Sequence, residues 1–146
     1  GGTWLDLWRL YDTDLIASEA LKARLRYTDG HDGLRVSNWY SVPAAPRPQR
    51  KYRLHLKPDG LTDRIEIRLN YPEKAGLRET VRFQYDSEGK IVGRQIDTQA
   101  WGRIEEHRIF DEKGKVGAVE WTRGERPFLR MDHVYYTADD IRLFHN

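Results

Sequence analysis

Cysteine is absent from the 146 residues of this chain, and methionine occurs only once. Without cysteine there is no disulfide framework, no thiolate metal site and no cysteine nucleophile. The chain also lacks any apolar run of about 18 residues, the length that a membrane-spanning helix needs. Lys and Arg exceed Asp and Glu by only 25 to 23, a net charge of +2. These absences predict a soluble chain without a transmembrane segment, and they give no long-range electrostatic argument for an anionic partner.

Aromatic residues, in contrast, are abundant. The chain holds 5 Trp, 8 Tyr and 4 Phe within a composition that is 38% hydrophobic and 33% charged. A disordered chain would not carry so many aromatic side chains. The length suits one hydrophobic core. We therefore expect residues 1–146 to form a single β-rich domain, with an extended proline-rich connection at 41–49 inside it.

Apolar and polar residues alternate with period two from about Arg50 onward. The clearest case is 64–71, where Ile65 and Ile67 alternate with charged neighbours. Turn sequences with Asp and Gly separate such segments, for example at 86–89 and 111–114. This pattern is typical of strands with one buried face and one charged face. It predicts an all-β fold, an antiparallel hairpin meander of roughly eight to ten strands that is barrel-like or strongly curved.

The segment 14–26 is compatible with two structures. Asp14 or Ser18 could cap a helix rich in Leu and Ala. In the same segment, however, Leu21, Ala23 and Leu25 alternate with basic residues, as they would in a strand. We favour strands here, with one short N-terminal helix as the alternative.

Two turn regions share a sequence pattern, FQYDSEGKI at 83–91 and IFDEKGKV at 109–116. Each has an aromatic residue, an Asp, a Gly three residues later, a Lys and a β-branched residue. The pattern resembles one unit of the YD repeats of RHS-type bacterial surface and toxin-delivery proteins. Those repeats form β-sheet shells and carry no chemistry, so the resemblance implies a structural or interaction role. It also favours an extracytoplasmic bacterial setting, as in a cell-envelope lipoprotein or a toxin and immunity system.

The candidates for catalysis or metal binding are Glu105, His107 and His133, because carboxylates and imidazoles serve both purposes. On a strand, Glu105 and His107 would share one face and Glu106 would point to the other. A solvated charged face explains the same residues more simply. No phosphate-binding glycine loop, HExxH helix or nucleophile elbow is present. We therefore predict no cofactor, no metal site and no catalytic group.

Basic residues gather beside Tyr52, namely Arg47, Arg50, Lys51 and Arg53. A sheet face with this pattern could stack RNA bases. Acidic residues follow closely, namely Asp59, Asp63, Glu66, Glu73 and Glu79. Such mixed charge is usual on a solvated sheet face, so we predict no nucleic-acid partner.

Adjacent aromatic residues occur at 39–40 and 135–136. Neighbours in a strand point to opposite faces, so one ring of each pair must point away from the main core unless a second layer buries both. Outward rings indicate an interface or a ligand cavity. The candidate binding residues are Trp39, Tyr40, Trp101, Trp121 and Tyr135.

These residues predict a non-catalytic binding domain with a protein partner, because protein recognition needs no cofactor motif. Two alternatives stay open. One is a lipocalin-like carrier of a small apolar ligand, with a cavity lined by Trp4, Trp8, Trp101 and Trp121. The other is an enzyme in which His107, His133 and a carboxylate converge in one cleft.

Overall fold

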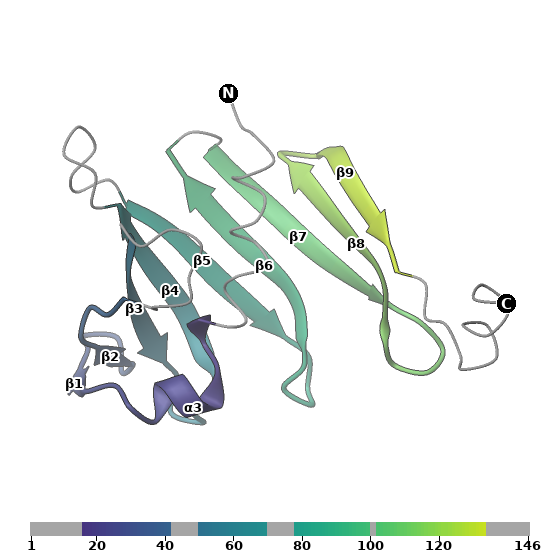
Figure 1. Cartoon of the computed structure of the whole chain (residues 1–146). Helices are drawn as coiled ribbons and strands as arrows, with labels where there is room; N and C mark the ends of the chain where they lie inside the picture. The colour runs from purple at the N-terminus through teal and green to yellow at the C-terminus, as the bar shows by residue number, and fades with distance from the viewer. Residues whose placement is uncertain (1–15, 42–49, 70–77, 100–101, 134–146) are drawn as a thin grey trace, which may run out of the picture.

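The computed structural model describes residues 16–41, 50–69, 78–99 and 102–133. They form one short helix and nine strands in a single antiparallel sheet whose strand order is the chain order (Figure 1). The elements are α3 Glu19–Lys22, β1 Tyr27–Asp29, β2 Arg35–Ser37, β3 Arg50–Leu56, β4 Thr62–Leu69, β5 Arg78–Tyr85, β6 Ile91–Thr98, β7 Gly102–Phe110, β8 Val116–Arg123 and β9 Arg126–Asp132. Within the described part, β1 and β9 stand at opposite ends, so this curved sheet is open. The predicted antiparallel meander is confirmed.

The strand register separates the sheet into an apolar face and a polar face. One continuous row on the apolar face crosses five strands through Leu54, Ile65, Val81, Ile96 and Ile104. None of these five side chains is more than 4% exposed. Burying one such side chain contributes about 1.5–3 kcal/mol, so the row forms the centre of the core. The side chains at the intervening positions form the polar face.

The β5–β6 and β7–β8 turns share one geometry. Asp86 and Asp111 each accept hydrogen bonds on Oδ1 from the backbone N–H groups two and four residues later, at 2.8–2.9 Å. Gly89 and Gly114 follow three residues after these aspartates and have φ values of 82° and 78°, which favour glycine. The Asp and Gly residues thus end the strands where the sequence predicts turns.

Successive hairpins are tied together at this end of the sheet. Lys57 Nζ lies 5.1 Å from the centroid of the Tyr85 ring, and Lys90 Nζ lies 4.6 Å from that of Phe110. Each lysine flanks the turn of one hairpin, and each ring precedes the turn of the next. Cation–π contacts of this kind contribute about 0.5–1 kcal/mol at exposed sites. They add to the backbone pairing that fixes the register.

The preference for strands over 14–26 is wrong for the described residues. Ser18 caps α3, and its Oγ accepts a hydrogen bond from the Leu21 N–H at 3.3 Å. Leu21, in α3, and Leu25, which lies beyond the end of α3, both pack against the core. The Lys22 ammonium donates to the Gly60 carbonyl at 3.1 Å, which anchors α3 to the β3–β4 turn. The short helix therefore covers part of the apolar face.

Several predicted features lie outside the described residues. These are the proline-rich connection predicted at 41–49, apart from Ser41, and the aromatic pair at 135–136. No helix in the described ranges has both the length and the apolar character needed to cross a membrane.

Candidate binding surface

Charges are distributed unevenly over the polar face. At the paired positions of β3, β4 and β5, six side chains are basic, namely Lys51, Arg53, Arg64, Arg68, Arg78 and Arg82. Glu66 is the one acidic side chain at those positions. On β6 to β9 the same face carries Asp97, Glu105, Glu120 and Asp132 against Arg103 and Arg130. The small net charge of the chain therefore conceals a basic half and an acidic half of one face.

The densest part of the basic half is a row of three cations. Lys51 pairs with Arg68 across β3 and β4, and Arg68 pairs with Arg78 across β4 and β5. Among the described residues, no carboxylate forms an ion pair with Arg68 or Arg78. Like charges placed directly opposite each other destabilise a sheet by roughly 0.2–1 kcal/mol per pair. The like charges in this row therefore lower the stability of the fold.

Trp39 lies over the same row. The centroid of its ring is 4.5 Å from the Arg53 guanidinium carbon, 4.9 Å from that of Arg68 and 5.9 Å from that of Arg78. Its side chain is half-buried. Contacts with an aromatic face attract guanidinium groups and restrict their rotation. The ring thus gathers arginines from three strands into one surface, which we call the tryptophan-arginine surface: Trp39, Lys51, Arg53, Arg68 and Arg78.

Tyr40, the next residue, points to the opposite face. It is buried, its ring centroid is 5.9 Å from that of Tyr52, and its hydroxyl donates to the Ile16 carbonyl at 3.0 Å. Burial raises the pKa of the Tyr40 phenol. The alternation predicted for 39–40 is therefore confirmed, with Tyr40 in the core and Trp39 outside it.

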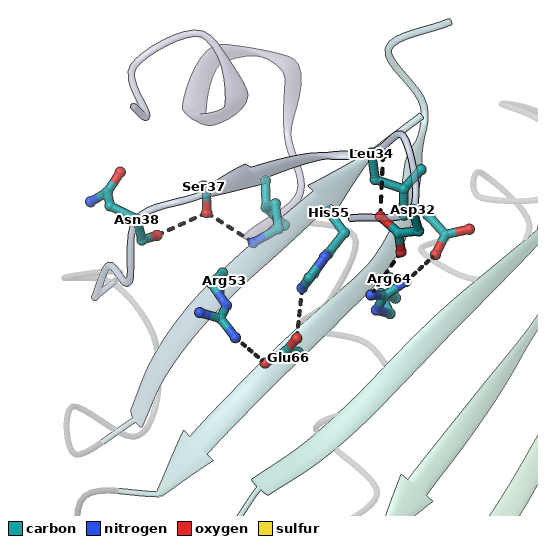
Figure 2. A network of polar contacts seen from close by, with 10 residues as sticks. Asp32, Leu34, Ser37, Asn38, Arg53, His55, Arg64 and Glu66 are labelled. Carbon is teal, nitrogen blue, oxygen red and sulfur yellow. Dashed lines mark hydrogen bonds and ion pairs between the residues drawn. The ribbon is translucent and has the colours of Figure 1, made fainter. Parts of the chain in front are cut away.

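Glu66 does not neutralise the row, because other groups already use its carboxylate. Arg53 donates to Oε2 at 2.7 Å, and His55 Nε2 lies 2.6 Å from Oε1 (Figure 2). Burial alone would raise the pKa of Glu66, but the hydrogen bond and the charge of Arg53, together with His55, outweigh burial and lower the pKa. Both oxygens of the Glu66 carboxylate are thus in contact with other side chains, Oε2 with Arg53 and Oε1 with His55.

His55 is the buried end of this network. Burial lowers the pKa of its imidazole, and the charge of Arg64 lowers it further, against the opposing effect of Glu66. Its Nδ1 atom is buried and has no hydrogen-bond partner among the residues that the structure describes. The arrangement fits a neutral imidazole that donates from Nε2 to Glu66. Arg64 is separately paired, with Asp63 at 3.0 Å and Asp32 at 3.3 Å (Figure 2).

The residues proposed for catalysis lie apart from this surface. Glu105 and His107 share the polar face of β7, as predicted, with 3.8 Å between Oε2 and Nε2. His133 follows β9, and β8 lies between β9 and β7. The described residues hold no group of three or more His, Asp or Glu side chains that could bind a metal ion.

Of the other predicted binding residues, Trp121 lies in the core. It is 1% exposed, and its indole N–H donates to Glu106 at 3.2 Å. A hollow of about 220 Å³ lies elsewhere, between α3 and the hairpin turns, and is lined by Lys22, Phe83 and Tyr85 among others. Trp101 and Tyr135 lie outside the described residues, as do Trp4 and Trp8.

Sequence reasoning missed Arg68 and Arg78. The basic cluster noted beside Tyr52 does not stay together, since Arg50 is buried on the apolar face. Glu79, counted among the neutralising acids, is also buried on the apolar face. The alternation within β4 and β5 could have revealed this arrangement, but the pairing of Arg68 with Arg78 required the register.

Comparison with models of protein families, with curated proteins and with solved structures finds no match. The class of the protein is therefore defined by its own architecture, an open antiparallel meander. Its most distinctive surface is the tryptophan-arginine surface on the polar face.

Proposed function

We propose that this chain is a non-catalytic binding domain whose partner is a protein with an acidic surface. The observation that carries the proposal is the position of Trp39 over a row of cations that has no carboxylate of its own among the described residues. An acidic partner would supply the missing charges. The cost that the row imposes on the fold would then be offset in the complex.

The residue types support this proposal. Trp and Arg are the side chains most enriched among the residues that dominate the energy of protein interfaces. Opposite charges on the two partners also increase the rate of association and favour one orientation. The YD-like turn sequences agree with an interaction role and with an extracytoplasmic setting, both of which remain predictions.

The carrier and the enzyme find less support among the described residues. Trp121, expected to line a ligand cavity, packs in the core with its indole N–H bonded to Glu106. His107 is half-exposed beside Glu105, and the described residues hold no group of three His, Asp or Glu side chains that could bind a metal ion.

A titration with a short polyglutamate peptide tests the proposal. Calorimetry measures affinity at low salt, and NMR follows the indole signal of Trp39. We expect binding that shifts this signal, and we expect Arg68→Glu to weaken it by about tenfold or more, which corresponds to about 1.4 kcal/mol. Arg103→Glu, on the polar face of β7, is the matched control and should change affinity much less.

Absence of binding by the unmodified protein would overturn the proposal. Equal losses of affinity in Arg68→Glu and Arg103→Glu would also overturn it, because binding would then depend on the overall charge of the protein and not on this surface.

A further inference from the structure

We infer that the group recognised by the tryptophan-arginine surface is a phosphate monoester on a protein segment, such as a phosphorylated serine, threonine or tyrosine. This inference rests on the proposed function and specifies the chemistry of the partner.

The first argument is the density of positive charge that no carboxylate of the described residues pairs with. Lys51, Arg68 and Arg78 occupy directly opposed positions on three adjacent strands, which are about 4.8 Å apart. Long side chains from such positions can converge on one group. A carboxylate offers two oxygens and one charge, whereas a phosphate monoester offers three acceptor oxygens and close to two charges at neutral pH. The phosphate matches three converging cations better.

The second argument is preorganisation. Arg68 and Arg78 lie within 6 Å of the ring centroid of Trp39, at 4.9 and 5.9 Å. Arg53 lies against the same ring, and its Nη2 is bound by Glu66. A guanidinium group held against a ring loses less freedom when it forms paired hydrogen bonds to an oxyanion. The surface is thus arranged before the ligand arrives.

The third argument separates a single phosphate from a nucleic-acid backbone. A backbone needs a continuous track of cations and several rings for stacking. Here the next row along the strands contains Glu66 and Thr80, and Arg64 beyond it is already paired with Asp63 and Asp32. The polar-face positions of β3, β4 and β5 add no Phe, Tyr or Trp to the ring of Trp39. Among the described residues of β3, β4 and β5, the cations that no described carboxylate pairs with are thus the row of Lys51, Arg68 and Arg78 and, two rows away, Arg82, which do not form a continuous track.

The test compares three peptides of identical Gly-Ser-rich sequence that differ at one central position, which is phosphoserine, glutamate or serine. NMR of the full chain measures affinity and maps the shifted signals. We expect the phosphoserine peptide to bind about tenfold or more tightly than the glutamate peptide and the serine peptide not to bind. Arg68→Gln and Arg78→Gln should remove the advantage of phosphate, and Arg103→Gln should preserve it.

Each of the following results would overturn the phosphate inference alone or together with the proposed function. If the glutamate and phosphoserine peptides bind equally and lose affinity in Arg68→Gln, the phosphate inference fails and the proposed function stands. If neither binds and polyglutamate does not bind either, both fail. If oligouridine binds more tightly than the phosphopeptide and loses affinity in Arg82→Gln, the partner is a nucleic acid and both fail. Trp39→Phe keeps an aromatic ring at this position. A urea denaturation curve of this variant shows whether any loss of peptide binding comes from a loss of folding stability.

Discussion

Glu106 in β7 lies directly opposite Arg94 in β6 on the apolar face, and their exposures are only 1% and 2%. Arg94 donates to Glu106 Oε2 from Nε at 3.0 Å and also from Nη2. Trp121 Nε1 donates to the same oxygen, and Arg108 Nε donates to Oε1 at 3.0 Å. These donors replace the water that the carboxylate loses on burial. Glu106 is therefore the centre of a buried network that joins three strands.

Glu106→Gln should destabilise the protein strongly. The substitution keeps the shape of the side chain but removes the negative charge that Arg94 and Arg108 bind in this buried site. Breaking a buried pair in this way costs about 3–5 kcal/mol, which urea denaturation would measure as a lower free energy of unfolding. Glu105→Gln, one residue earlier on the half-exposed polar face, is the control and should change stability by less than about 0.5 kcal/mol. Similar losses in the two variants would contradict the buried network.

Strand alternation alone predicted that Glu105 and His107 share a face and that Glu106 points away from them, and the structure confirms this. The same local chemistry predicted the turns, because Asp and Gly act within a few residues. It failed in the segment 14–26, where helical and strand spacing both fit the sequence. There Leu21 lies in α3 and packs against the core, a contact that no local pattern specifies.

The candidate site was less predictable than the fold, because it depends on register. The grouping of Lys51, Arg68 and Arg78 joins residues from three strands, and a shift of one residue in either pairing would place a different side chain in the row. One ring of the pair 39–40 was predicted to point away from the core, but the sequence did not say which ring. The arginines that surround Trp39 come from segments that no local pattern connects.

Gly93→Ala should destabilise the sheet through a close backbone contact. A Cβ atom at Gly93 would lie 2.6 Å from the Glu106 carbonyl oxygen and 2.8 Å from the Gln84 side-chain oxygen. Overpacking of this kind costs about 1–3 kcal/mol, which thermal or urea denaturation would detect. Gly117→Ala is the matched control in β8, where the nearest atoms would be 3.6 Å away, and it should be nearly neutral. A neutral Gly93→Ala variant would mean that β6 and β7 lie further apart than described.

The stabilising effect of Glu66 should depend on pH in one direction. Its folded pKa lies below the ordinary value of 4.5, so Glu66 stabilises the fold above that pH, and the effect is lost as the pH falls through the folded pKa. We expect Glu66→Gln to lower the free energy of unfolding at about pH 6 and to approach the unmodified protein at about pH 3. Urea denaturation at both pH values measures this difference. Glu88→Gln, in the exposed β5–β6 turn, is the control for removing a glutamate at an exposed position. A constant difference for Glu66→Gln at the two pH values would show that its charge is not the cause.

Arg78→Glu should stabilise the protein, in contrast to most substitutions. It replaces a like-charge pair with an opposite-charge pair beside Arg68, and such cross-strand pairs differ by roughly 0.2–1 kcal/mol. The gain should shrink at high salt, since the screening length falls from about 10 Å at 0.1 M to about 3 Å at 1 M. Arg103→Glu is the control with the opposite sign, because Arg103 Nε donates to Asp97 at 2.9 Å and the change breaks that pair.

The same Arg78→Glu variant should lose affinity for the phosphoserine peptide. A residue that weakens the fold and strengthens binding is expected where function, and not stability, determines the side chain. A residue that only supports the sheet would lose stability and binding together. If Arg78→Glu proves less stable than the unmodified protein at low salt, the row of cations is compensated in the fold itself, and the argument for an anionic partner at this surface fails.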